Sequence, residues 1–164
     1  MTKRRPTNLP RWQELAVYMS FGLLLATGIA WLVFDRWVRV AGEFGPEHHP
    51  AERLMLIVHA IGAYAFLVVV GAMIPVHIPL GWHQRRNLAS GITFVTICAL
   101  LGVTALGLYY VGEDTLRGWT SSVHWVVGLV ALPALLIHVV RGRALITRPR
   151  AKSPRRRDRP KRAG

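Results

Sequence analysis

Long apolar runs separated by short polar segments form the main pattern along this chain. Each run is about 20 residues long, which is the length that an α-helix needs to cross about 30 Å of hydrocarbon. Because backbone groups in lipid must be hydrogen-bonded within the protein, such runs are expected to be helices. The pattern therefore predicts four membrane-spanning helices, at residues 15–34, 54–76, 88–111 and 119–140.

Four consecutive spans predict an all-α protein, an integral membrane four-helix bundle with up-down-up-down topology. We expect the bundle domain to cover residues 15–143, between a basic tail at residues 1–14 and a second basic tail at residues 144–164 that is disordered. The basic start followed by an apolar run resembles a signal peptide. The run has no small-residue cleavage site, however, so we interpret it as a retained span.

The positive charge of the chain lies outside the apolar runs. The sequence holds 21 Lys and Arg against 8 Asp and Glu, a net charge of +13, which by itself would favour nucleic-acid binding. Eleven of the basic residues follow Val140, and this segregation is typical of a membrane protein with basic ends rather than of a nucleic-acid-binding domain. The second tail can bind anionic membrane lipid, at about 1 kcal/mol per basic residue, or serve only as a topology anchor.

Basic and acidic connections alternate along the chain. Both tails and the connection with Arg85 and Arg86 are basic, whereas the connections at residues 35–53 and 112–118 hold most of the acidic residues. The positive-inside rule then makes both termini and the second connection cytoplasmic. The predicted location is the bacterial inner (plasma) membrane, with the first and third connections outside.

Four of the seven histidines lie within or at the ends of the predicted spans: His59, His77, His124 and His138. An ionisable residue inside a membrane is costly and is a functional candidate. His59 and His77 are 18 residues apart, so they lie on one face of the second helix. His124 and His138 are 14 residues apart, which leaves them about 40° from alignment on the fourth.

The positions of these histidines along their spans predict which of them lie opposite each other on the two helices. His59 and His124 lie near the outer ends of their spans, and His77 and His138 near the inner ends, about 21 to 27 Å away along the helix axis. Zinc requires three or four clustered ligands, whereas a haem iron needs one protein ligand on each face of the porphyrin. We therefore predict two haems, with His59/His124 and His77/His138 as the axial iron ligands. The single cysteine, Cys98, and the absence of a CxxCH motif indicate non-covalent attachment.

Three alternatives remain open from the residues alone. Pro75 and Pro79 flank His77, and an early end of the second helix would make His77 interfacial and His83 its replacement. A single-haem protein would use only His59 and His124. A haem-free scaffold, or a small transporter with the histidines as a proton relay, is the alternative from another functional class.

Helices two and four resemble each other in their histidines, and helices one and three in a Thr-Gly element, Thr27 with Gly28 and Thr104 with Gly107. The segments that carry a wider resemblance are LLLATGIAWLV, HHPAERLMLIVHAIG, PVHIPLGWHQRRNLASG, LGLYYVG and SSVHWVVGLVALPALLIHVV. In these segments, over about residues 15–143, the chain resembles the small bacterial four-helix cytochrome b561 and b6-like membrane proteins, including the DUF4405-type domain.

The resemblance implies non-covalent haem b, membrane electron transfer and His59, His77, His124 and His138 as axial ligands. The 18-residue spacing in helix two departs from the 14 residues usual in cytochrome b proteins. The expected function is electron exchange between the quinone pool and a partner redox protein, as a subunit of a larger oxidoreductase complex rather than as a stand-alone enzyme. The chain itself has no nucleotide fingerprint and no cysteine cluster.

Other residues have candidate roles around such a site. Gly62 and Gly128 follow His59 and His124 by about one helical turn and are expected to make room for a flat macrocycle. Four arginines are candidates to pair with haem propionates or serve as topology charges: Arg36, Arg53, Arg85 and Arg86. Tyr64 and Tyr109 are candidates for contacts with quinone. His48 and His49 could contact an external partner, bind a metal ion, take up quinol protons or simply face solvent.

Overall fold

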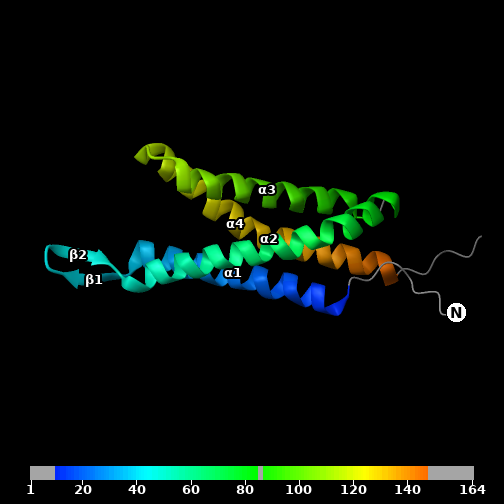
Figure 1. Ribbon diagram of the computed structural model, residues 1–164, viewed down its shortest axis with the longest axis horizontal. Coiled ribbons are helices and arrows are strands. Elements are labelled where there is room, and N and C mark those ends of the chain that lie inside the picture. Colours follow the sequence, from blue (N-terminus) through cyan, green and yellow to red (C-terminus); the bar gives the residue numbers. More distant parts are fainter. Residues whose placement is uncertain (1–9, 85–86, 148–164) are drawn as a thin grey trace, which may run out of the picture.

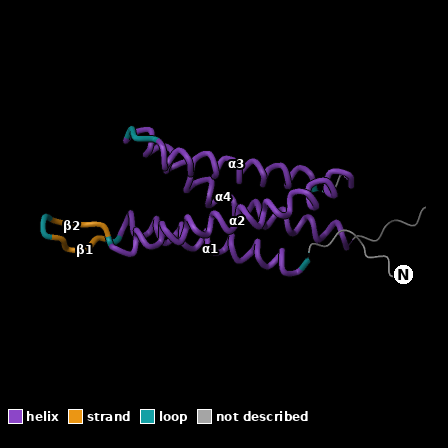
Figure 2. Tube along the Cα trace, viewed as in Figure 1, coloured by secondary structure: helices purple, strands orange, loops and turns teal. Residues whose placement is uncertain are grey.

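The computed structural model describes residues 10–84 and 87–147, which form long helices and one short β-ribbon (Figures 1 and 2). The elements are α1 (Arg11–Trp37), β1 (Arg39–Gly42), β2 (Gly45–His48), α2 (Pro50–Gln84), α3 (Leu88–Tyr110) and α4 (Asp114–Thr147). Each of these helices is long and apolar enough to cross a membrane. The predicted all-α class is therefore confirmed, and the four candidate spans indicate a multi-pass membrane protein.

The helices extend beyond the predicted spans. α2 continues through Pro75 and Pro79 to Gln84, so the second helix does not end early at His77. Proline is tolerated inside membrane helices because neighbouring groups satisfy the backbone that it leaves unpaired. The helical ends at residues 11–14 and 144–147 belong to segments that were assigned to the tails. Residues 1–9 and 148–164 of the tails, with Arg85 and Arg86, lie outside the described residues.

The connection between α1 and α2, expected to be a loop, contains an antiparallel β-ribbon. Arg39 pairs with His48, and Gly42 with Gly45. Gly45 has a φ of +128°, a conformation that side chains other than glycine rarely adopt. The ribbon projects from one end of the bundle, here called the ribbon end, and the start of α1 and the end of α4 lie at the other, the terminal end (Figure 1).

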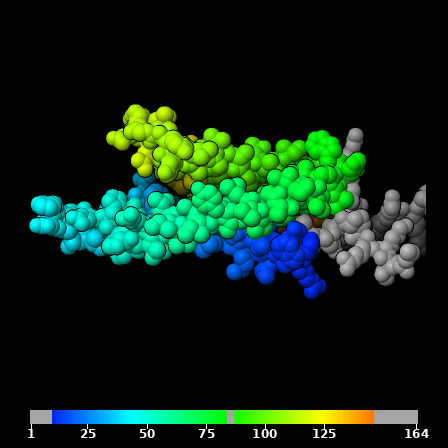
Figure 3. Space-filling model, viewed as in Figure 1, coloured from blue at the N-terminus to red at the C-terminus, as the bar shows by residue number. Residues whose placement is uncertain are grey.

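The helices pack as two hairpins. α1 packs along α2 to form the first hairpin, and α3 along α4 to form the second, while α1 and α4 join the two. The chain reverses direction from each helix to the next (Figure 1). On the face seen in Figure 3, α2 and α3 run along the length of the molecule.

A small apolar core lies in the middle of the bundle. Its buried residues come from α1, α2 and α4: Val17, Phe21, Phe66, Ala131 and Leu135. The ring of Phe21 lies 6.0 Å from that of Phe66 and 6.4 Å from that of Phe94 on α3, measured between centroids. Many other large apolar side chains are exposed on the outer faces of the helices, as expected for surfaces that contact lipid, because lipid tails are as apolar as these side chains.

Polar contacts secure the helix ends. At the terminal end, Glu14 of α1 forms an ion pair with Arg143 of α4 and accepts a hydrogen bond of 2.9 Å from Tyr18. At the start of α4, the Glu113 carboxylate accepts hydrogen bonds from the backbone N–H groups of Leu116 and Thr115, at 2.6 and 2.9 Å. These bonds hold the pKa of Glu113 below its usual range, since they favour the charged form.

The close α3–α4 contact at Gly107 gives a test of hairpin packing. A Cβ atom on Gly107 would lie 2.9 Å from the Thr120 methyl group, whereas one on Gly102 would meet nothing within 4 Å. Gly107→Leu should therefore destabilise the protein by roughly 1–3 kcal/mol through overpacking, and Gly102→Leu, the matched control, should have a much smaller effect. Denaturant unfolding in detergent, followed by circular dichroism, measures both. Equal losses in the two variants would contradict this packing.

Candidate functional site

The structure brings the four intramembrane histidines together as two pairs, each linking the first hairpin to the second. The rings of His59 on α2 and His124 on α4 have centroids 6.3 Å apart and planes inclined by 77°. The rings of His77 on α2 and His138 on α4 have centroids 6.0 Å apart and planes inclined by 71°. His83 is exposed near the end of α2, and it is the ring of His77 that lies beside His138.

The imidazole of His59 is held from within its own hairpin. Its Nδ1 lies 3.1 Å from Thr27 Oγ1 and 3.0 Å from the Leu24 carbonyl oxygen, both on α1. The Thr27 hydroxyl donates its hydrogen to the Leu23 carbonyl at 2.7 Å. The hydroxyl oxygen and the Leu24 carbonyl therefore act as acceptors for an Nδ1–H group. The hydrogen-bond network thus assigns the proton of His59 to Nδ1 and leaves the Nε2 lone pair free.

His124 has the same arrangement in the second hairpin. Its Nδ1 lies 2.8 Å from Thr104 Oγ1 on α3. The Thr104 hydroxyl donates to the Leu100 carbonyl at 2.8 Å, so its oxygen is again the acceptor. His59 and His124 therefore both offer Nε2 to a ligand and are oriented through Nδ1, which is the usual arrangement of metal-binding histidines.

His138 and His77 differ in how they are held. His138 Nδ1 lies 3.1 Å from Ser90 Oγ, whose hydroxyl donates to the Asn87 side-chain oxygen at 2.5 Å. The Asn87 amide donates to the His138 carbonyl at 2.8 Å, and Phe94 stacks on the His138 ring with centroids 6.3 Å apart. His77 is exposed, and no hydrogen bond from its ring to another described residue is present.

Two glycines give the histidine rings room against the neighbouring helix. A Cβ atom on Gly28 would lie 3.2 Å from His59 Cε1, and one on Gly91 would lie 3.4 Å from His138 Cε1. The expected glycines are placed differently. A Cβ atom on Gly62 would meet Leu23 and Leu24 of α1, and one on Gly128 would meet Leu101 of α3. Gly62 and Gly128 therefore serve contacts within each hairpin, and the expectation that they face a macrocycle is not supported.

Trp125, the residue after His124, has an indole N–H group without a hydrogen-bond partner among the described residues. Its Nε1 atom is buried, and a buried N–H group normally has a partner.

The other candidate residues lie outside the two histidine pairs. The side chains of Tyr64 and Tyr109 are exposed, with 74% and 82% of their areas accessible. His49 caps α2, because its Nδ1 accepts the Ala51 N–H at 3.1 Å, and its ring stacks on Phe34 with centroids 5.0 Å apart. Arg36 lies 3.3 Å from the Asp35 carboxylate.

Sequence reasoning missed the residues that orient the histidines. Thr27, Ser90 and Thr104 are buried polar residues, and each contacts a histidine Nδ1. The repeated Thr-Gly element was the available signal, because it placed a hydroxyl at a similar position in helices one and three. The pattern gave no information on which ring atom each hydroxyl would meet.

The chain matches no protein-family model, no curated protein and no solved structure at a significant level. The resemblance to cytochrome b561 and b6-like proteins therefore stays a prediction.

The backbone at Asn87 provides a test of how His138 is supported. Asn87 has a φ of 55°, the left-handed conformation, which costs a residue with a Cβ atom roughly 1–2 kcal/mol. Asn87→Ala and Asn87→Gly both remove the amide bond to His138, but only glycine relieves the backbone. The alanine variant should be less stable than the glycine variant by about 1 kcal/mol, measured by unfolding in detergent. Equal stabilities would show that Asn87 is not strained.

Proposed function

We propose that this protein transfers electrons across a membrane and holds two b-type haems, one between His59 and His124 and the other between His77 and His138. The single observation that carries the proposal is the presence of two facing imidazole pairs, one toward each end of the same bundle. In this proposal the helices form an up-down-up-down bundle in the bacterial plasma membrane, with both termini cytoplasmic. We propose on the same grounds that the chain is a member of the small four-helix cytochrome b561 and b6-like group.

If Nε2 of both rings held one iron atom, two iron–nitrogen bonds of about 2 Å and about 1.1 Å from each ring centre to its nitrogen would place the ring centres about 6 Å apart. The observed centroid separations are 6.3 and 6.0 Å. Each level offers two imidazole nitrogens, which is too few for a structural zinc site and matches the two axial positions of a haem.

The surroundings of the histidines support the same assignment. The hydroxyls of Thr27 and Thr104 accept Nδ1–H and so present Nε2 as the ligand atom. Gly28 and Gly91 allow the rings of His59 and His138 to approach the neighbouring helix. The unpartnered Trp125 Nε1 is a donor suited to a carboxylate such as a propionate.

The chain provides position and environment, and haem supplies the one-electron redox chemistry when bound. The histidines fix the two levels, and buried apolar residues such as Phe66 and Leu135 form the core between them. We propose that electrons pass between the quinone pool and a partner redox protein, with this chain as a subunit of a larger oxidoreductase complex.

Haem content tests the proposal directly. The full chain, purified from haem-replete cells, should show a Soret band that sharpens and shifts on reduction and should contain about two haems by pyridine haemochrome assay, one for each bis-imidazole site. His59→Ala or His124→Ala should remove about one haem, and His77→Ala or His138→Ala about the other. His83→Ala is the matched control and should keep both.

Two outcomes would contradict the two-haem assignment. A folded but colourless preparation would favour the haem-free scaffold or proton-relay alternative. Unchanged haem content in the His77→Ala and His138→Ala variants would leave a single haem between His59 and His124.

The hydroxyl contacts predict a shift in reduction potential. Thr104→Val removes the hydroxyl that accepts Nδ1–H from His124. The imidazole would become a weaker donor, a bound ferric iron would be stabilised less, and the potential of that haem should rise by roughly 20–50 mV, the equivalent of about 0.5–1 kcal/mol. Thr27→Val should cause a smaller rise, because the Leu24 carbonyl still accepts Nδ1–H from His59. Thr93→Val is the control, because the Thr93 hydroxyl bonds only the Ala89 carbonyl. Potentiometric titration of the α-band measures the shift, and unchanged potentials would contradict the tautomer assigned to these histidines.

A further inference from the structure

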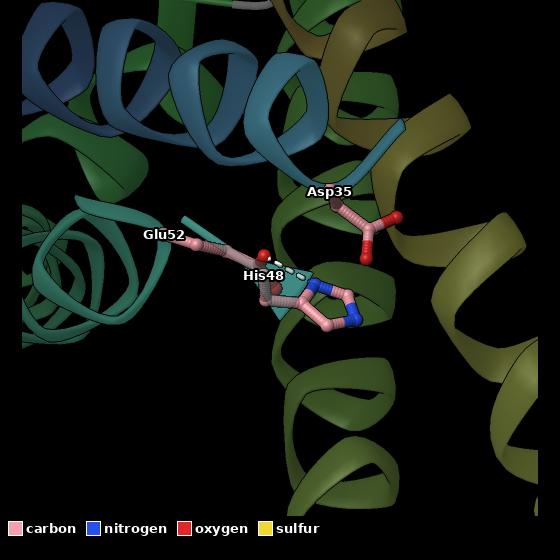
Figure 4. Close-up of side chains that lie close together, drawn as sticks. All are labelled: Asp35, His48 and Glu52. Atoms are coloured by element: carbon pink, nitrogen blue, oxygen red, sulfur yellow. Dashed lines mark hydrogen bonds and ion pairs between the residues drawn. The ribbon is translucent and has the colours of Figure 1, made fainter. Parts of the chain in front are cut away.

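A second group of metal-ligating side chains lies at the ribbon end, apart from the intramembrane histidines. It consists of Asp35 near the end of α1, His48 at the end of β2 and Glu52 in the first turn of α2 (Figure 4). One ligand atom from each residue lies within 4.8 Å of the others. His48 Nδ1 and Glu52 Oε2 are 2.6 Å apart. The Asp35 carboxylate lies on the other side of the imidazole in the close-up.

The β-ribbon is the reason that these three residues meet. Its register pairs Arg39 with His48, so the chain folds back and brings the last residue of β2 beside the end of α1. α2 begins at Pro50, two residues after His48. The first turn of that helix therefore carries Glu52 to the same place. The three candidate ligands come from three different elements, α1, β2 and α2, and the hydrogen-bonded β-ribbon fixes the positions of these elements relative to one another.

We propose that Asp35, His48 and Glu52 bind a divalent transition-metal ion. One imidazole nitrogen and two carboxylates form a mixed nitrogen and oxygen donor set, which suits Zn²⁺, Mn²⁺ or Fe²⁺, whereas Ca²⁺ and Mg²⁺ are bound through oxygen ligands. Two carboxylates also neutralise the double positive charge. This site goes beyond the proposed electron-transfer function and does not depend on it.

The site is sheltered on one side and open on the other. The side chains of Asp35 and Glu52 are 25% and 16% exposed, while that of His48 is 61% exposed. A cavity of about 290 Å³ lies beside the cluster and is lined by His48 and Glu52 together with His49 and Arg53. Three protein ligands leave at least one coordination position for water or for an incoming ligand, and this cavity provides the room.

Two arginines lie beside the three candidate ligands. Arg39 Nη1 lies 3.0 Å from His48 Nδ1, and Arg39 also donates to the Asp35 carbonyl oxygen at 2.8 Å. Arg36 Nε lies 3.3 Å from the Asp35 carboxylate. A cation bound between the three ligands is repelled by these guanidinium groups. Removing the positive charge of Arg39 should therefore strengthen metal binding. If the cluster is only a network of hydrogen bonds and ion pairs, removing Arg39 should produce no gain in metal affinity.

Zn²⁺ titration of the untagged full chain in detergent tests the site. Isothermal calorimetry should show one saturable Zn²⁺ site per chain. Asp35→Asn, His48→Gln and Glu52→Gln should each weaken it by about 10- to 100-fold, whereas Arg39→Gln should tighten it. His83→Gln, which alters an exposed histidine far along α2, is the matched control and should leave the affinity unchanged. Mn²⁺ provides a second readout, because its sharp solution electron paramagnetic resonance signal is lost on binding.

The proposal is wrong if the native chain shows no saturable Zn²⁺ site, or if the three ligand variants bind as tightly as the native chain and the His83→Gln control. Loss of binding through misfolding is recognised by circular dichroism. The Arg39→Gln variant separates loss of a ligand from loss of the fold, because a gain in Zn²⁺ affinity cannot arise from unfolding. A weaker site in that variant would also overturn the proposal.

Discussion

A hydroxyl group on the neighbouring helix orients the imidazole of His59 and that of His124, and the arrangement of the bundle at the ribbon end depends on these two contacts. The hydroxyl belongs to Thr27 for His59, and to Thr104 for His124. Each hydroxyl gives its own hydrogen to a carbonyl of its helix and can only accept. His59 and His124 are therefore each oriented by a residue of their own hairpin, and their rings meet where the two hairpins pack together.

The two hairpins repeat the same design with one difference. At the ribbon end, both histidines have hydroxyl partners. At the terminal end, His138 is held by Ser90 and Asn87, while His77 is exposed. The difference follows from spacing, because His77 lies 18 residues after His59 but His138 only 14 after His124. One extra helical turn carries His77 toward the end of α2, which ends at Gln84.

Periodicity and length were sufficient to predict the helices, since an apolar run long enough to cross a bilayer has few alternatives. Histidine spacing likewise predicted which rings would come together, because depth along a helix can be counted from sequence. The β-ribbon was missed, since the segment from Arg39 to His48 has no alternating apolar pattern and is held by pairing and a glycine turn. The partners of the histidines were missed because a hydroxyl contact depends on the rotation of one helix about its axis against the next. A single sequence does not report that rotation.

The apolar core has a consequence for energy conversion. Phe66 lies between the two histidines of α2, and Ala131 and Leu135 between those of α4, so the two histidine levels are separated by a layer of buried apolar residues, here called the septum. Under the proposed function, an electron that crosses this septum moves without an accompanying proton, and its passage is electrogenic. A full crossing is worth about 2.3 kcal/mol per 100 mV of membrane voltage. The distribution of electrons between the two ends would then follow the voltage of the membrane, and the protein would couple redox state to the energised state of the cell.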